Sequence, residues 1–282
     1  MSEKPGILYV IATPIGNLQD ISFRARQVLQ EADLILAEDT RHSRILLDHW
    51  QIRTPMRSYH EHNEQASVPA LLDELRNGSN IALISDAGTP LISDPGFPLV
   101  KAAHEQGIKL VPVPGPAAFL AALSISGMTT EKFIFEGFLR GKSVARRKHL
   151  QSLTNEERTM VFYEAPHRIL QLLKEIQDIF GSGRMVCVSR EMTKRFESIY
   201  RGTCGKVLEI LSSNPEQQQG EFVLILQGCD ITVAHDISKA ASVMKILLHH
   251  GITVKQASNI AADITGVRKN ELYQLALQLS EK

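Results

Sequence analysis

The chain of 282 residues is poor in cysteine and carries no excess charge of either sign. Its three cysteines, Cys187, Cys204 and Cys229, lie far apart and form no C-x-x-C pair. This spacing excludes a disulfide framework and a zinc knuckle, and it is typical of a protein of the reducing cytoplasm. Because 31 Lys and Arg balance 31 Asp and Glu, a uniformly basic coat that binds any polyanion is excluded as well.

Long apolar segments are also missing from the sequence. The apolar run at residues 7–12 is too short for the core of a signal peptide. The longest uncharged stretch, residues 111–130, approaches the length of a membrane span, but Pro112, Pro114 and Pro116 interrupt it. We therefore expect neither export nor a membrane span. With 43% apolar residues, the composition is that of a globular protein, and the length predicts about two domains.

Glycine-rich phosphate-binding motifs are the third absence. The segment from Ala12 to Asp20 follows a predicted strand, but it contains only Gly16 and does not match G-x-G-x-x-G. The motif G-x-x-x-x-G-K-[ST] does not occur either. NAD and ATP need such loops to hold their phosphates at a helix N-terminus. The sequence therefore favours a ligand without phosphates, held by the backbone of loops.

Short apolar runs that alternate with helical patterns are what the sequence does contain. This alternation predicts an α/β fold with a largely parallel sheet. Further along the chain, several strands follow one another without room for a helix, which predicts a mixed sheet. The predicted units are an α/β domain at 1–130, a second α/β domain at 131–232 and a helical appendix at 233–282. Strands are expected at 7–12, 34–37, 81–84, 109–113, 133–136, 158–163, 184–189, 196–202 and 221–227, and helices at 22–31, 40–49, 97–106, 116–126, 143–153 and 166–180.

The loop from Ser85 to Gly96 is the most informative segment. It follows a buried strand and repeats Ile-Ser-Asp-x-Gly at a spacing of eight. Glycine lets a ligand approach the backbone, and Asp and Ser side chains accept hydrogen bonds from hydroxyls and amines. Ligands of open α/β sheets bind at this end of the strands. The alternative is a pair of tight turns that cap the next helix. Similar strand-end segments are 12–20, 113–119, 163–168 and 220–222.

Basic residues are concentrated in the middle of the chain. Residues 136–210 hold 14 Lys and Arg against 9 Asp and Glu. The densest part, residues 140–148, contains five cations and no anion, which would supply phosphate contacts on an accessible surface. The alternative is a solvated helix start. The expected RNA-contacting residues here are Arg140, Lys142, Arg146, Arg147 and Lys148.

Two further segments leave alternatives open. His60-Glu61-His62 invites a zinc site, but on a strand the two histidines share one face with no Cys or third His nearby, so we expect no metal. The tail resembles a helix-turn-helix in outline only. Arg268, Lys269 and Asn270 are placed where a recognition helix reads bases; the alternative is a satellite that touches the RNA backbone or a partner subunit.

Six sequence blocks together resemble the tetrapyrrole methylase-like (class III) S-adenosylmethionine-dependent methyltransferases, and among them the bacterial enzymes that methylate a cytidine ribose 2′-hydroxyl in small-subunit ribosomal RNA. The blocks are ATPIGNLQDISFRA, AEDTRHSRILL, ISDAGTPLISDPG, VPVPGPAAF, FEGFLRGK and YEAPHR. The resemblance implies two α/β domains with S-adenosylmethionine in the cleft between them, a homodimer, and 16S ribosomal RNA or the small subunit as substrate. Gly88-Thr89-Pro90 matches the Gly-Asp-Pro turn of the family, with Thr in place of Asp.

The resemblance also implies roles for individual residues. Glu38, Asp39 and His42 become candidates for the general base or for orienting the acceptor, although an acidic residue at a helix start is often only a cap. Arg41 and Arg44 are expected to bind phosphates. No metal is required for methyl transfer. The expected donor-binding residues are Pro14, Ser85, Asp86, Gly88, Thr89, Pro90, Asp94, Ala117, Ala118, Tyr163, Glu164, Ala165 and Glu221.

Two other functions compete with an RNA methyltransferase. One is a methyltransferase of the same fold that acts on a porphyrin or corrin precursor. The other is a non-catalytic RNA-binding or ribosome-assembly module built on the basic segment and the tail. Two Asp-x-Gly turns and a small-residue helix start favour an enzyme, because a binding module has no need of them.

Overall fold

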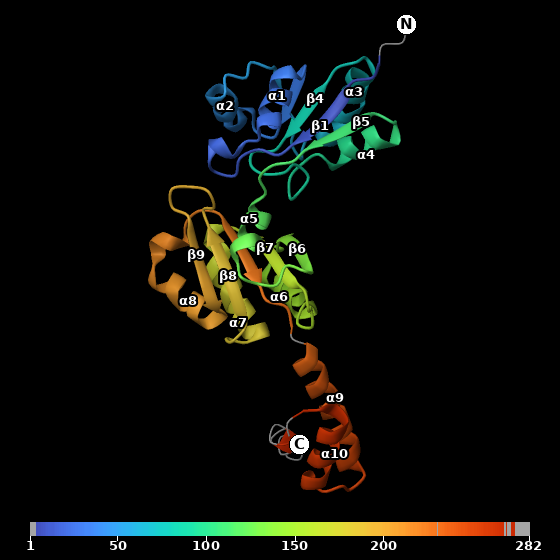
Figure 1. The fold of residues 1–282 in the computed structure, drawn as a ribbon, viewed down its shortest axis with the longest axis vertical. Coiled ribbons are helices and arrows are strands. Elements are labelled where there is room, and N and C mark those ends of the chain that lie inside the picture. The colour runs from blue at the N-terminus through green and yellow to red at the C-terminus, as the bar shows by residue number, and fades with distance from the viewer. Residues whose placement is uncertain (1–3, 230, 268, 270–271, 274–282) are drawn as a thin grey trace.

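The computed structural model describes residues 4–229, 231–267, 269 and 272–273. Three units follow one another along the longest axis of the molecule (Figure 1). The first contains a sheet of five strands in the order β3-β2-β4-β1-β5, and every pairing in it is parallel. This confirms the predicted parallel sheet. Its strands are β1 (Ile7–Ile11), β2 (Leu34–Ala37), β3 (Met56–Ser58), β4 (Ile81–Ile84) and β5 (Lys109–Val113).

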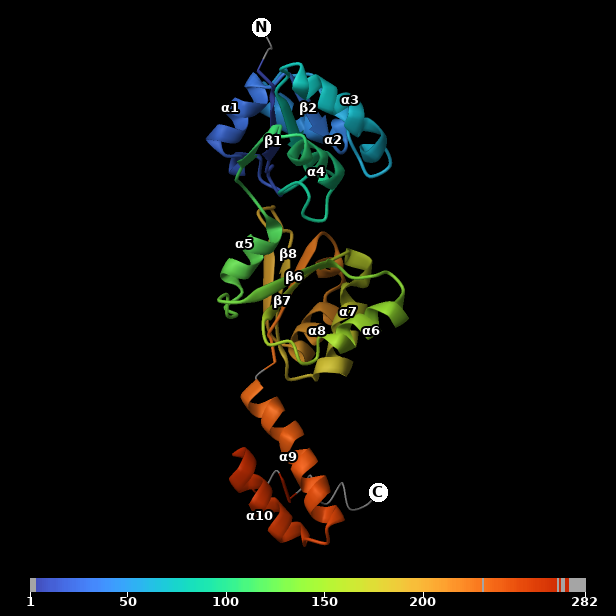
Figure 2. The ribbon, with the colours of Figure 1, turned by 90° about the vertical axis from the view of Figure 1, so that its right-hand side faces the viewer.

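Helices cover both faces of the first sheet (Figure 2). One face packs against α1 (Phe23–Glu31) and α2 (Thr40–His49), and the other packs against α3 (Glu64–Arg76) and α4 (Phe97–Glu105). Because β2 and β4 are covered on both faces, all their residues are buried, and they read as continuous apolar runs. A short 3₁₀ helix, η1 (Leu18–Asp20), follows β1.

The second unit contains a mixed sheet in the order β6-β7-β10-β8-β9, in which only β6 and β7 run parallel. The predicted mixed sheet is thus confirmed. Helices α6 (Ser143–Ser152), α7 (Ile169–Phe180) and α8 (Cys204–Ser213) pack on one face of it. The strands are β6 (Phe133–Phe138), β7 (Thr159–Glu164), β8 (Met185–Arg190), β9 (Ser198–Thr203) and β10 (Phe222–Leu226), and two 3₁₀ helices are η2 (Pro166–Arg168) and η3 (Pro215–Gln218).

Helix α5 (Ala118–Ile125) packs on the other face of this second sheet, although the sequence placed it in the first unit. Its Ala122 and Leu123 are buried against Val161 and Cys187. The assignment of residues 118–125 to the first domain is therefore wrong, because their apolar side chains belong to the second core. The helix also begins later than predicted, at Ala118, so Pro116 lies before the first turn.

The third unit contains α9 (Ile231–His249) and α10 (Val254–Thr265), which pack on each other through a small core of their own. Thr253 caps α10 by accepting the Gln256 N–H, and Gly266 ends it in a left-handed conformation. Most of the third predicted helical pattern, including Arg268 and Asn270, lies outside the described residues. In the part of the chain that the structure describes, no helix has the length and apolarity of a membrane span.

Candidate functional site

Two adjoining cavities lie where the first and second units meet. The first measures about 440 Å³ and the second about 370 Å³, and both are lined by Ile15, Asp86, Ala87 and Glu221. The walls come from the carboxyl ends of β1, β2 and β4 in the first unit, and from β7 and β10 in the second. This is the end of the parallel strands at which ligands bind in open α/β sheets.

Two loops of the first unit are joined into one surface at the cavities. Thr13 and Gly88 exchange both backbone hydrogen bonds, with N···O distances of 2.8 and 3.0 Å. The Thr13 hydroxyl also donates to the Ser85 carbonyl at 3.1 Å. Gly88 has φ of +85°, which favours glycine at this turn. The loops after β1 and β4 are therefore held in a fixed relation to each other.

Three carboxylates of the first unit line the first cavity: Glu38, Asp86 and Asp94. Burial, and then the negative charge of Glu38, raises the pKa of Asp94 to about 7. Burial, and then the charge of Asp86, also raises the pKa of Glu38. Asp86 accepts the Asp39 N–H at 3.0 Å. The cluster can stabilise a cationic ligand, and Asp94 can take up a proton near neutral pH.

Asp39 differs from its neighbours in this cluster. Its side chain caps α2 by accepting the Arg41 N–H and forms an ion pair with the Arg41 guanidinium at 3.0 Å. Hydrogen bonds from Arg41 lower the pKa of Asp39 to about 2. Asp39 lines neither cavity, so the structure places Glu38 in the first cavity and His42 in the second but gives Asp39 the role of a helix cap.

The second unit supplies the opposite wall. The Tyr163 hydroxyl accepts the Phe119 N–H at 3.3 Å, which ties α5 to β7. The Glu164 side chain is fully buried and forms an ion pair with Arg168 at 2.9 Å, so its charge is compensated by its own unit. The Glu221 side chain is exposed and meets Lys194 at 2.9 Å.

Most of the expected donor-binding residues meet at the two cavities. The exception is Pro90, which is buried and lines neither cavity. Residues in the first cavity are Asp86, Gly88, Thr89, Asp94, Ala117, Ala118, Tyr163, Glu164, Ala165 and Glu221, and residues in the second are Pro14, Ser85, Asp86 and Glu221.

Sequence reasoning missed the contribution of Phe138 and of the loop after β8. Phe138 and Met192 line the first cavity, and Lys194 lines the second. The loop that carries Met192 holds Glu191 and Thr193 at φ of 51° and 64°. On the other side, Leu91 and Ser93 have φ of 72° and 70°. None of these residues is of a type that signals a left-handed conformation in sequence.

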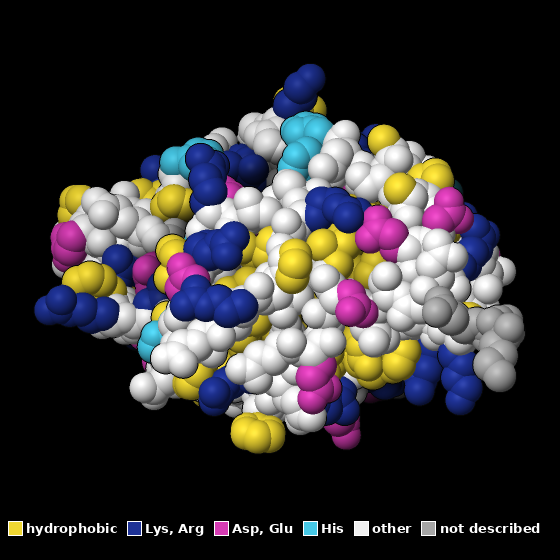
Figure 3. Space-filling view, turned by 90° about the horizontal axis from the view of Figure 1, so that it is seen from above, with side chains coloured by type: hydrophobic (Ala, Val, Ile, Leu, Met, Phe, Trp, Pro, Cys, Tyr) yellow, Lys and Arg dark blue, Asp and Glu magenta, His cyan; other side chains and the backbone are white. Residues whose placement is uncertain are grey.

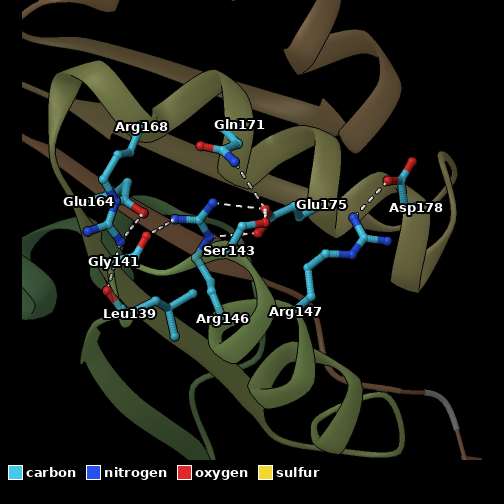
Figure 4. Close-up of polar contacts among 10 residues, drawn as sticks. All are labelled: Leu139, Gly141, Ser143, Arg146, Arg147, Glu164, Arg168, Gln171, Glu175 and Asp178. Carbon is cyan, nitrogen blue, oxygen red and sulfur yellow. Dashed lines mark hydrogen bonds and ion pairs between the residues drawn. The ribbon is translucent and has the colours of Figure 1, made fainter.

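The basic segment divides into a buried part and an exposed part, and Figure 4 shows Arg146 directed toward Glu175 and Arg147 toward Asp178. The Arg146 side chain is 1% exposed and binds Glu175 with an Nε···Oε2 distance of 2.6 Å. The expectation that Arg146 contacts RNA is therefore wrong, because its guanidinium is enclosed with a carboxylate of α7. Arg147 is partly exposed and pairs with Asp178 at 3.0 Å. Arg140, Lys142 and Lys148 are exposed, as are Arg41 and Arg44 in the first unit.

His60 and His62 do not lie on a strand, as the sequence suggested, but in a turn between β3 and α3. Their rings contact edge to face at a centroid distance of 5.9 Å. In the described ranges, no group of three or more His, Cys, Asp or Glu is arranged to hold a metal ion.

Seen from above, the surface of the molecule shows basic side chains among acidic and apolar ones (Figure 3).

Comparison with family models gives two matches. The model described as Tetrapyrrole (Corrin/Porphyrin) Methylases matches residues 7–208. The model described as RsmI C-terminal HTH domain matches residues 234–280. The second match covers the tail, which in sequence resembles a helix-turn-helix in outline.

Curated relatives match the chain over its whole length. A protein of Haemophilus influenzae named "Ribosomal RNA small subunit methyltransferase I" is 47% identical and covers 100% of both chains. A protein of the same name from Pseudomonas aeruginosa is 48% identical over 98% of this chain and 99% of its own. A third, from Escherichia coli O157:H7, is 45% identical over 97% of this chain and 95% of its own.

Solved structures with low sequence identity share the fold. Cobalt precorrin-4 methyltransferase, a cobalamin biosynthetic enzyme, aligns with a TM-score of 0.59 at 18% identity, over 78% of this chain and 94% of its own. Diphthine synthase aligns with a TM-score of 0.60 at 12% identity, over 79% of this chain and 90% of its own. The α/β architecture of the first two units is thus that of known methyltransferases.

Proposed function

The chain belongs to the tetrapyrrole methylase family, and on this basis we propose that it is an S-adenosylmethionine-dependent methyltransferase that acts on RNA of the small ribosomal subunit. The observation that carries the proposal is full-length similarity, at 45–48% identity, to relatives named "Ribosomal RNA small subunit methyltransferase I". The paired cavities between the two α/β units supply a place for the reaction.

The chemistry of the cavities fits the donor. S-adenosylmethionine supplies a methyl group on a positively charged sulfur, and since its amino group and its carboxylate carry opposite charges, the donor is a cation overall. Carboxylates of Glu38, Asp86 and Asp94 face this space and would stabilise such charges. Small apolar side chains of Ala117 and Ala118 leave room for a flat ring against the start of α5.

We assign the acceptor as a cytidine ribose 2′-hydroxyl, in line with the family blocks of the sequence. A ribose hydroxyl is a poor nucleophile until a base removes its proton. Glu38 and Asp94 are suited to this role, because burial raises the pKa of both. Asp39 is a weak base by comparison, because Arg41 holds its pKa at about 2.

Contacts to RNA phosphates are assigned to exposed cations of both units. Arg140, Lys142 and Lys148 are exposed in the second unit, and Arg41 and Arg44 in the first. Arg147 contributes less, because Asp178 already pairs with it. The tail adds a helix-turn-helix, which we propose contacts the RNA or the partner subunit. We further propose that the protein works as a homodimer in the cytoplasm.

The test is methyl transfer by the purified protein. With labelled S-adenosylmethionine and undermethylated small subunits, label is expected in the RNA, at a cytidine ribose. Label in a porphyrinogen but not in RNA would replace this function with the alternative tetrapyrrole activity. An absence of transfer together with RNA binding would favour a non-catalytic module.

Replacing Asp86 by Ala gives a second, sharper test. We expect at least a 10-fold weaker affinity for S-adenosylmethionine, because the variant loses a carboxylate of the cavity and the acceptor for the Asp39 N–H. RNA affinity is expected to change less than two-fold. Asp73→Ala, an exposed carboxylate of α3, is the matched control. Unchanged donor affinity in Asp86→Ala, measured by calorimetry, would contradict the assignment of the cavity to the donor.

A further inference from the structure

Phe138 is an exposed aromatic side chain at the wall of the first cavity. It is the last residue of β6, and 58% of it is exposed. Its ring lies 5.4 Å from that of Tyr163, measured between centroids. Tyr163 in turn contacts Phe135 at 5.0 Å, and Phe135 contacts Phe119 at 4.6 Å. Phe119 also contacts Phe133 at 6.3 Å, so Phe138 is one exposed end of a row of five aromatic rings and the end that lines the first cavity.

A β-bulge directs Phe138 toward the cavity. The register of β6 against β7 shifts between Phe135 and Gly137, so that Phe138 lies opposite Tyr163. Without the extra residue, the alternation of the strand would turn Phe138 to the opposite face of the sheet. Gly137 has φ of +60°, and a Cβ there would lie 3.2 Å from the Ser93 hydroxyl. The bulge therefore depends on glycine.

The loop that follows Phe138 carries two exposed cations on a fixed backbone. The Leu139 carbonyl accepts a hydrogen bond from Arg168 at 2.7 Å, and the Gly141 carbonyl lies 3.5 Å from Arg146 (Figure 4). Both arginines are anchored by buried carboxylates. Arg140 and Lys142 are the residues next to these two carbonyls; both are exposed and have no ion-pair partner among the residues that the structure describes.

We propose that Phe138 is a platform on which a base of the RNA strand stacks at the first cavity, with neighbouring phosphates bound by Arg140 and Lys142. A single RNA strand combines flat bases, which stack on aromatic rings, with one negative charge per phosphate. The acidic interior of the cavity suits a cationic donor, whereas this rim suits a polyanion with aromatic bases. The inference rests on the proposed RNA substrate and identifies how that substrate is held.

The test compares Phe138→Ala, Phe138→Leu and Phe138→Trp. Base stacking on an aromatic side chain accounts for about 5- to 100-fold in affinity when it is removed. We therefore expect KM for undermethylated small subunits, and Kd for a single-stranded RNA of the same sequence, to rise by that factor in Phe138→Ala and Phe138→Leu. Phe138→Trp is expected to stay within three-fold of the wild type. Donor affinity is expected to stay within two-fold in all three.

Two controls separate stacking from other roles. Val144→Ala removes another exposed apolar side chain, 84% exposed on α6 and outside both cavities, and is expected to leave RNA affinity unchanged. Arg140→Gln with Lys142→Gln is expected to flatten the salt dependence of RNA binding, because fewer counterions are released. Phe138→Ala is expected to keep the wild-type salt slope.

The outcomes distinguish this inference from the function on which it rests. If the wild-type protein transfers no methyl group to RNA, the proposed function fails. If the wild type is active and Phe138→Leu matches it, the ring does not stack on a base and the inference fails alone. A parallel loss of donor affinity in Phe138→Ala would assign the ring to the donor side and would also overturn the inference.

Discussion

Asp94 and Glu38 show how neighbouring charges tune single residues at this site. Each carboxylate is half-buried beside another negative charge, and each pKa is raised as a result. A donor with positive charge would relieve this repulsion, because its charge favours the ionised carboxylates. Repulsion between these carboxylates therefore destabilises the free protein, whereas their attraction to the donor stabilises the complex. Affinity for the donor and the proton balance of the site are linked through these residues.

As the pH rises, the titration of Asp94 should increase the affinity for the donor and lower the stability of the fold. Its pKa of about 7 means that the ionised form appears only as pH rises through 7, so donor affinity should increase from pH 6 to pH 8. The folded state binds this proton more tightly than the unfolded chain, whose Asp pKa is about 4, so the free energy of unfolding should fall between about pH 4 and pH 7. Calorimetry measures the donor affinity, and thermal melts measure the change in stability.

Asp94→Asn is the variant that checks this prediction. It should remove the pH dependence of donor affinity over this range, and its melting temperature relative to the wild type should be higher at pH 8 than at pH 5. Asp73→Asn, at an exposed position of α3, serves as the control. If donor affinity depends on pH equally in the wild type and in Asp94→Asn, a group other than Asp94 causes that dependence.

Arg146 shows the limit of sequence reasoning at a single residue. It lies in a run of cations whose members are indistinguishable by type or spacing. Its partner Glu175 comes from another helix, α7, so only the packing of α6 on α7 decides which cation is enclosed. Glu38 could be found from sequence because it directly follows the buried strand β2, and Asp94 because it lies in the second copy of the repeated Ile-Ser-Asp-x-Gly motif. Their altered pKa values could not be, because these depend on the distances between loops.

At the scale of elements, buried strands were the easiest to predict. The bounds of β2, β4 and β5 agree with the apolar runs of the sequence. Strand β3, helix α3 and helix α8 were missed. β3 has only three residues, none of them buried. Helix α3 does carry the helical spacing, at Val68, Leu71, Leu72 and Leu75, so its signal was available. The bulge in β6 left no pattern beyond one glycine.

The α6–α7 pair should depend strongly on its buried ion pair. In Arg146→Met, the Glu175 carboxylate stays buried without its partner, which should lower the free energy of unfolding by about 3–5 kcal/mol. The double variant with Glu175→Met should recover much of this loss, because no charge then stays buried. Urea denaturation of the full chain measures both.

Arg147→Met is the matched control for this pair. Arg147 is partly exposed and Asp178 is exposed, so the loss should lie within about 1 kcal/mol. If Arg146→Met proves as stable as Arg147→Met, the enclosed pair does not contribute as its burial indicates.

At the scale of the whole molecule, the sequence predicted two α/β units and a helical tail but could not predict how the units meet. The loop after β8 reaches the first unit, where Thr193 accepts the Asn17 N–H at 3.2 Å. Lys194 packs over Gly16, where a Cβ would lie 2.3 Å from its Cγ. These contacts join residues more than 170 positions apart, and no local pattern encodes such a pairing.

The proposed homodimer has a candidate surface on α5 and β6. Leu120 and Ile125 of α5 and Phe133 of β6 are exposed, and Phe119 links the two elements through its contact with Phe133 at 6.3 Å. Leu120→Asp should therefore shift the sedimenting species from dimer to monomer at micromolar concentration, because a charge would be buried at the interface. Val144→Asp on α6 should leave the dimer intact. A monomeric wild type would rule out the homodimer.

The left-handed residues beside the first cavity have a consequence for how ligands arrive. Leu91 and Ser93 in one unit, and Glu191 and Thr193 in the other, hold conformations that cost about 1–3 kcal/mol each. The surrounding contacts must enforce these shapes in the free protein as well. A ligand thus meets walls that are already formed, and little of its binding free energy is spent on ordering them. The walls of the cavity are therefore preorganised for the ligand, and the strained residues that form them lower the stability of the fold.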